Sequence, residues 1–259
     1  VFLVPMIYRL VFVFIFTFSL IVAQSDLQNG IRYYNQRHEG CVEDRADPKP
    51  ISQAISHFEK ALADQKNKDE ASLYLLKSYY FKAKFTESNK QKIKDLLKKG
   101  KELGQELVDR YPESAEYRYW YLVNLGSWAE VYGILAAARE GVADQMRSHS
   151  KKIIELDPGY EDGAGYFMLG AVHYKSPYIP FLLSWPNNKD ALKWLEMSYN
   201  TGDAKLAQGV YLAQSLYKDG QKNEAINLLD KISKATPSED DYASDWEWIK
   251  KAKELHAEY

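Results

Sequence analysis

Five histidines and one cysteine are the side chains of this 259-residue sequence best suited to catalysis or metal binding. The histidines are His38, His57, His149, His173 and His256. None of them lies beside a serine or cysteine in a nucleophile motif such as Gly-x-Ser-x-Gly. His173 lies on an apolar helical stretch and is expected to pack in a core or groove rather than to act as a base. The sequence therefore indicates that the protein is not an enzyme.

Metal and phosphate motifs are also missing from the sequence. Cys41 has His38 and Glu43 close to it, but the chain supplies no second cluster of ligands at metal spacing. A single cysteine cannot form an internal disulfide. Gly163-x-Gly165 lacks the preceding strand and the further glycine of a phosphate-binding loop. We therefore expect no cofactor and no metal.

Aromatic residues are unusually frequent, with 20 Tyr, 6 Trp and 10 Phe. Many lie in three segments, at 113–132, 163–174 and 175–188. Trp and Tyr combine an apolar body with a polar group, which suits grooves and interfaces. The alternative is that most of them pack between helices as core. The candidate ligand- or partner-binding residues are Tyr117, Trp120, Asn124, Trp128, Tyr132, Tyr166, His173, Tyr174, Tyr178, Phe181 and Trp185.

A repeat motif at residues 203–237 organises the helices that must position these side chains. Small residues at Ala213 and Ala225 mark a close approach of two helices, Gly220 permits a sharp turn and Pro237 ends the second helix. The offsets are those of a tetratricopeptide (TPR) hairpin of about 34 residues. One such hairpin cannot bury its own apolar face, so further hairpins must adjoin it. The apolar and small positions that match are Leu212, Ala213, Leu216, Gly220, Ala225, Leu229, Ile232 and Pro237.

The rest of the chain carries helical periodicity and no β pattern of any length. We expect ten or eleven helices, with one long helix over 136–156. The fold class is all-α, a TPR-like α-solenoid of about four to five irregular helical hairpins with space for a central hydrophobic pore or groove. Residues 24–259 are treated as a single helical domain. Its last clear hairpin is 203–237, and a capping helix follows at 238–257.

An apolar insertion at 175–188 interrupts the helical pattern with three prolines. Loops are normally surface segments. So much apolar surface must either pack back onto the domain or cover a ligand or partner.

Residues 1–23 have the pattern of a signal peptide. Arg9 precedes an apolar run, Leu10 to Val22, of the usual length, and Ala23 is a suitable cleavage point. The run is short for a membrane span of about 20 residues, and a retained anchor is the alternative. No cysteine directly follows the run, so no lipid attachment is expected. Cleavage implies a periplasmic or secreted protein.

The net charge of −2 gives no general electrostatic reason for the chain to bind nucleic acid. Nucleic acid is therefore not expected among its partners.

Three motifs lie close together in the sequence: Leu156-Asp157-Pro158-Gly159-Tyr160, Gly163-Ala164-Gly165-Tyr166 and Leu169-Gly170. Through them the chain resembles the T-component proteins associated with TRAP transporters, a bacterial periplasmic TPR-like family. The resemblance covers roughly residues 50–237 and includes the aromatic helix around Trp120 and Trp128, the insertion and the last hairpin. It implies a scaffold that assembles with the periplasmic substrate-binding subunit of the transporter, with a central hydrophobic pore. The chain departs from lipid-anchored members because the end of its leader, Leu20-Ile21-Val22-Ala23-Gln24, has no cysteine.

Two functions follow from these patterns. The first is an exported binding scaffold that grips a protein partner on the concave surface of the solenoid. The alternative is a periplasmic carrier that encloses a hydrophobic small molecule in an aromatic-lined pore. Self-association through the terminal helices is also open.

Overall fold

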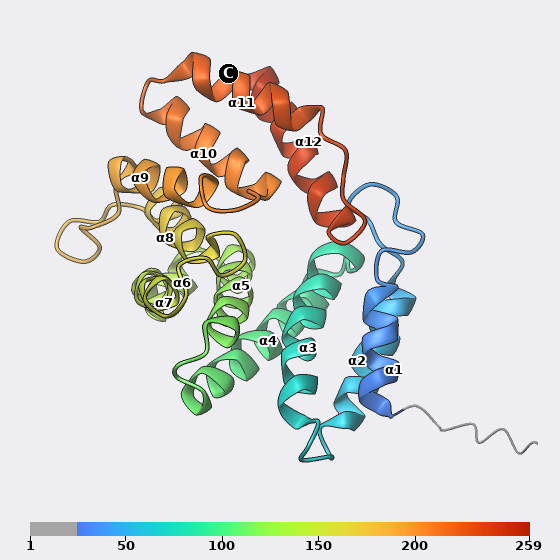
Figure 1. Ribbon diagram of the computed structural model, residues 1–259. Coiled ribbons are helices and arrows are strands. Elements are labelled where there is room, and N and C mark those ends of the chain that lie inside the picture. Colours follow the sequence, from blue (N-terminus) through green and yellow to red (C-terminus); the bar gives the residue numbers. More distant parts are fainter. Residues whose placement is uncertain (1–24) are drawn as a thin grey trace, which may run out of the picture.

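Helices make up the regular structure of residues 25–259, the part of the chain that the computed structural model describes (Figure 1). The all-α class is therefore confirmed. Two isolated β-bridges lie outside the helices. The helices are α1 Asp26–Asn35, α2 Pro48–Ala61, α3 Lys68–Phe81, the π-helical turn η1 Lys82–Thr86, α4 Lys90–Arg110, α5 Ala115–Tyr132, α6 Ile134–Arg139, α7 Val142–Leu156, α8 Ala164–Lys175, α9 Asn188–Tyr199, α10 Leu206–Lys218, α11 Lys222–Ser233 and α12 Tyr242–Glu258.

Side-chain caps fix where several of these helices begin. Ser25 and Gln28 form a capping box at α1, Asn89 accepts hydrogen bonds from two backbone N–H groups of α4, and Ser114 accepts one from α5. Asp47 caps α2, whose first residue is Pro48. These residues satisfy backbone N–H groups that have no partner within the helix.

Consecutive helices pack against one another along the chain, most extensively α4 with α5, α8 with α9, α1 with α2 and α10 with α11, and α12 packs on α11 and α10. The seam of the final hairpin is filled as its motif predicts, because Ala213 and Ala225 are fully buried and Gly220 has a φ of 92°. In α8/α9 the two helices approach across Gly170, whose position faces Leu195. Small residues therefore set the distance between the paired helices.

One predicted helix is divided in two. A single helix was expected over 136–156, but Gly141 has a φ of 62° and separates the short α6 from α7. A left-handed residue cannot continue a right-handed helix. Ile134 and Ala137 of α6 border the cavity described below.

The last helix returns to the first, so the solenoid closes into a ring (Figure 1). Ala243 of α12 is fully buried in the core formed by α1, α2 and α3. Nearby, the ammonium of Lys250 lies 2.8 Å from the Asp44 carboxylate in the α1–α2 connection. The backbone N–H of Ala243 also donates to the His38 ring, 3.5 Å away. Residues about 200 positions apart thus hold the ring closed.

None of the helices within 25–259 has both the length and the apolar character needed to cross a membrane. The segment 1–23, for which a signal peptide was expected, lies outside the described residues.

Candidate functional site

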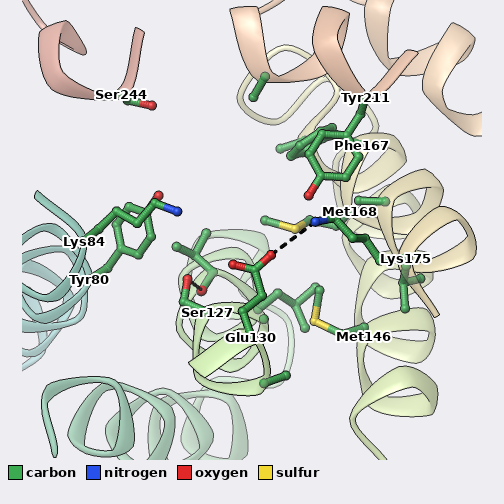
Figure 2. A pocket seen from close by; sticks show the side chains of 18 of the residues that line it. Tyr80, Lys84, Ser127, Glu130, Met146, Phe167, Met168, Lys175, Tyr211 and Ser244 are labelled. Carbon is green, nitrogen blue, oxygen red and sulfur yellow. Dashed lines mark hydrogen bonds and ion pairs between the residues drawn. The ribbon is translucent and has the colours of Figure 1, made fainter. Parts of the chain in front are cut away.

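A cavity of about 1210 Å³ occupies the centre of the ring. Helices α3, α5, α8, α10 and α12 supply its walls, and the turn η1 and the helices α6 and α7 contribute to its edge. Figure 2 shows its side chains converging from several of these elements. The site is therefore built by the closed ring and not by any one hairpin.

One wall of the cavity is apolar. Met146 of α7 and Phe167 and Met168 of α8 lie together there (Figure 2), and Leu122 and Val172 extend the surface. Methionine is unbranched and flexible, so this wall can adapt to differently shaped apolar groups.

Two tyrosines face the cavity from different helices. Tyr80 comes from α3 and Tyr211 from α10, and Figure 2 shows the Tyr211 hydroxyl pointing into the space. Burial raises the pKa of both phenols well above the ordinary value. Both hydroxyls therefore keep their protons near neutral pH and can donate as well as accept a hydrogen bond. The Tyr211 ring is held by Phe167 and Trp248, at ring-centroid distances of 5.3 and 5.6 Å.

Fixed charges of both signs complete the lining. The Lys84 ammonium of η1 lies 2.8 Å from the Glu247 carboxylate of α12. On the opposite side the Glu130 carboxylate of α5 lies 3.6 Å from the Lys175 ammonium of α8 (Figure 2). Both side chains of the second pair, Glu130 and Lys175, are more than half exposed. Their mutual attraction is therefore weak, and each charge is free to interact with a bound group as well.

Trp120 is the one predicted site residue among the described residues that border the cavity. Its indole Nε1 is buried and has no hydrogen-bond partner within 25–259. The Lys77 ammonium lies 5.5 Å from its ring, and the Tyr80 ring 6.3 Å. A buried donor without a partner is costly, so a bound acceptor group at this edge of the cavity would be stabilised.

Three predicted residues of α5 lie in the packed core instead. Asn124 is fully buried and its Nδ2 donates to the backbone oxygens of Leu76 and Trp120, at 3.2 and 2.9 Å. Trp128 is buried and stacks on Tyr132 at 4.5 Å. The contact of Asn124 with Leu76 joins α5 to α3. Helical spacing places Asn124 and Trp128 on one face with Trp120, but the fold divides these residues between the core and the cavity.

The other helical candidates are also outside the cavity wall. Tyr117 stacks on Tyr111, Tyr166 on Trp194, and Tyr174 contacts the edge of Tyr211 from behind the wall. His173 is buried, and burial lowers its pKa, which favours the neutral ring. Its ring packs against Trp185 at 4.8 Å. The structure brings His173 and Trp185 together but separates them from Trp120.

The insertion between α8 and α9 is divided between a packed base and an exposed tip. Trp185 donates from Nε1 to the Asp144 carboxylate at 2.8 Å and is half-buried. Tyr178 and Phe181 are exposed. The apolar insertion therefore does not pack back onto the domain along its whole length.

Several cavity residues were not among those predicted from the sequence. Tyr80 belongs to an apolar stripe of α3, and Tyr211 adjoins the repeat motif of α10, so both resembled ordinary packing positions. Lys84, Glu130 and Glu247 resembled solvated charges. The available signal was that Tyr80 and Tyr211 carry a polar group at positions where these repeats pack apolar side chains.

The arrangement has the character of a binding site. No group of three or more His, Cys, Asp or Glu side chains within 25–259 could hold a metal ion. The cavity combines an adaptable apolar wall with hydroxyls and fixed charges, as binding sites do. The fold and the site together define a TPR-like helical-repeat protein of the regulatory or scaffold type.

Comparison with a solved structure confirms the TPR-like solenoid. A thermophilic TPR protein of Thermus thermophilus superposes with a TM-score of 0.57 at 16% sequence identity, over 90% of this chain and 96% of that one. Similarity at this identity establishes the fold alone.

The chain belongs to the family of regulators of microtubule dynamics, proteins 1 to 3, whose model matches residues 38–182. It is similar to regulator of microtubule dynamics protein 3 of Rattus norvegicus, with 29% identity over 192 residues, which is 67% of this chain and 39% of the rat protein. The Mus musculus protein of the same name is 28% identical over 181 residues, covering 70% of this chain and 36% of that protein. The match thus spans less than two-fifths of each of these relatives.

This membership corrects the family assignment made from sequence. The chain is not a TRAP-transporter T-component, and the periplasmic substrate-binding subunit is not its partner, because its relatives are regulators of microtubule dynamics. The predicted periplasmic or secreted location is wrong on the same finding, because the chain matches regulators of microtubule dynamics and not an exported bacterial family. The alternative of a periplasmic carrier is wrong with it. The physical reason is that TPR spacing records how helices pack, which unrelated families share.

Proposed function

We propose that this chain is a non-enzymatic protein-binding module that acts on microtubules by holding an extended segment of tubulin in its central cavity. The family supports microtubules as the setting. The TPR-like solenoid supports a protein partner, because such repeats present a continuous concave surface.

The size and polarity of the cavity carry this proposal. Its volume of about 1210 Å³ exceeds the roughly 300–1,000 Å³ of ordinary small-molecule pockets. Its wall offers hydroxyls at Tyr80 and Tyr211 and charges of both signs at Lys175 and Glu130. An extended polypeptide segment points successive side chains to opposite sides, so it can place apolar side chains on the apolar wall and polar groups against the hydroxyls and charges.

The absence of enzymatic activity is part of the proposal. The described histidines serve as packing groups in several places. His173 packs on Trp185, His149 on Tyr121 and His57 on Tyr33. Burial lowers the pKa of His149 and of His173, which leaves both rings neutral near pH 7. None of these three rings borders the cavity, whereas His38 does, and the His38 ring packs against the edge of Phe81 at 5.1 Å.

Filling the cavity tests the proposal. Ser127 lies on α5 inside the cavity (Figure 2), and Ser127→Trp places a large side chain there. Glu102→Trp on the exposed face of α4 is the matched control. Co-sedimentation with purified microtubules should show binding weakened about tenfold or more by Ser127→Trp, a loss of about 1.4 kcal/mol or more, and unchanged by Glu102→Trp.

Thermal unfolding of both variants distinguishes a blocked site from a damaged fold. Ser127→Trp is expected to keep a midpoint close to that of the unmodified protein, because the cavity has room for the indole. If a folded Ser127→Trp protein binds microtubules as well as the unmodified chain does, the segment does not occupy the cavity and the proposal is wrong.

A further inference from the structure

We propose that the loop between α8 and α9, residues 176–187, inserts its tip into a lipid surface that contains anionic headgroups. The apex of this loop, Phe181, and its neighbour Tyr178 lie outside the lining of the central cavity, which the loop borders through Pro177, Ile179, Leu182 and Leu183. Figure 1 shows the connection between α8 and α9 projecting from the body of the solenoid.

The tip of the loop is apolar and exposed. The twelve residues 176–187 contain no Asp, Glu, Lys or Arg. Phe181 is fully exposed at the apex, and Tyr178 and Leu182 are 64% and 73% exposed. Large apolar side chains gathered on a protrusion mark a site of membrane or protein interaction.

The backbone of the tip is already hydrogen-bonded. The N–H of Ile179 donates to the Leu183 oxygen and the N–H of Leu183 donates to the Ile179 oxygen, each at 2.8 Å. The N–H of Leu182 also donates to the Ile179 oxygen at 3.2 Å. Pro177 and Pro180 have no N–H to satisfy. Few backbone donors would therefore lose water on entering an apolar phase, where each one without a partner costs several kcal/mol.

The base of the loop holds this tip in one orientation. Trp185 is fixed by its hydrogen bond to Asp144, by the His173 ring at 4.8 Å and by the Arg147 guanidinium 4.6 Å from its centroid. Pro186 is buried. Phe181 is therefore exposed on a loop whose base is fixed, so binding requires little further loss of conformational entropy.

Basic side chains lie on α7 and α9, the two helices next to the base of the loop. Arg147 and Lys151 lie one turn apart on α7, and Lys189 and Lys193 lie one turn apart at the start of α9. The Asp144 carboxylate accepts the hydrogen bond from Trp185, and the Asp190 carboxylate accepts one from Asn187. An uncharged tip within a basic border is the pattern that anionic lipid surfaces attract.

A lipid surface fits these features better than a protein partner does. Protein interfaces centre on a broad packed patch enclosed by a polar rim. This tip is one narrow turn, with Phe181 at a left-handed φ of 65°. Tyr178 and Trp185 stand closer to the base, where amphipathic rings suit the headgroup region.

Site-specific fluorescence on the full chain tests the inference. In a Cys41→Ser background, Phe181→Cys carries an environment-sensitive fluorophore, and Val42→Cys carries the same label as a control. Val42 is a matched position because it is also an exposed apolar residue, on the α1–α2 connection. The vesicles are phosphatidylcholine with or without phosphatidylserine, and nitroxide-labelled lipid serves as the quencher.

Insertion predicts that the label at 181 shifts to the blue and is quenched by the nitroxide lipid, while the label at 42 is not. It also predicts that Lys189→Glu weakens vesicle affinity at least threefold only when phosphatidylserine is present. The inference is overturned if the protein does not float with vesicles, if it floats without quenching at 181, or if both labels are quenched equally. It is equally overturned if the label at 181 responds only when tubulin is added.

Discussion

At the scale of single residues, close helix approach rests on positions where no side chain fits. A Cβ at Gly170 would lie 2.6 Å from Leu195 Cγ and 3.0 Å from the Leu195 backbone N, which is closer than real contacts allow. Gly126 of α5 is different, because the nearest atom to an added Cβ is Met146 Cε at 3.7 Å. The same residue type therefore has a packing role in α8 and none in α5.

Gly170→Ala is expected to lower the free energy of unfolding by about 1–3 kcal/mol, because overpacking forces α8 and α9 apart. Gly126→Ala should be neutral or should stabilise by up to about 1 kcal/mol, since alanine is the better helix former. Urea denaturation of the two variants measures both values. Equal effects would show that the α8/α9 seam tolerates a methyl group.

The sequence predicts the helix-packing residues better than the residues of the site. Ala213, Ala225 and Gly170 follow a repeat motif whose spacing encodes local packing. Whether an aromatic residue faces core or cavity depends on the curvature of the whole solenoid. Trp120 and Trp128 lie two turns apart on α5, and only Trp120 borders the cavity.

At the scale of elements, the docking of α12 depends on a neutral histidine. His38 lies at the end of the segment after α1 and accepts from the Ala243 N–H at 3.5 Å, while its ring contacts the edge of Phe81. Burial, and then the nearby positive charge of Arg37, lowers the pKa of His38 to about 4, against the opposing charges of Asp240 and Asp241. Protonation would therefore disfavour this contact.

Stability is expected to fall as the pH drops from about 6.5 toward 4. In the unfolded chain His38 takes up a proton near its ordinary pKa of 6.5, whereas in the folded protein its pKa is about 4. The contribution of neutral His38 to the free energy of unfolding is therefore complete above pH 6.5 and is lost as the pH falls from 6.5 to about 4. After allowance for partial exposure the loss is about 1–2 kcal/mol. Thermal melts at pH 7.5 and 5.0 measure it.

His38→Gln is the control, because glutamine does not titrate in this range. It should reduce the pH dependence without abolishing it, since the pKa values of His149 and His173 are lowered in the same direction. An unchanged slope in His38→Gln would show that His38 does not sense pH.

At the scale of the whole molecule, the ring closes through contacts between its two ends. Lys84 and Glu247 face each other across this junction and are about one-third and one-quarter exposed. Lys250 adds contacts to Asp44 at 2.8 Å and to Glu43 at 3.4 Å. Because α12 forms part of the cavity wall, closure of the ring and integrity of the site are coupled.

Reversing the charges at the junction tests this coupling. Lys84→Glu or Glu247→Lys alone brings like charges together and should cost about 1–2 kcal/mol, between the values for exposed and buried pairs. The double reversal should recover most of the loss. A double-mutant cycle in urea denaturation measures the interaction, and losses that simply add would show that the pair does not contribute.

Closure was not predictable from sequence, although the solenoid was. Helix patterns and hairpin motifs are local, whereas the Ala243 and His38 contact joins residues 205 positions apart. The family was misassigned for a related reason. The residues that suggested it, such as Leu169-Gly170, serve helix packing, and the fold they specify is shared by unrelated proteins.

Photo-crosslinking from inside the cavity tests the central claim most directly. A benzoylphenylalanine in place of Phe167 lies on the cavity wall (Figure 2), and one in place of the exposed Met197 on α9 is the control. With purified microtubules, irradiation should join position 167 to a tubulin peptide and leave position 197 without an adduct. No adduct from 167, or equal yields from both positions, would contradict a tubulin segment held in the cavity.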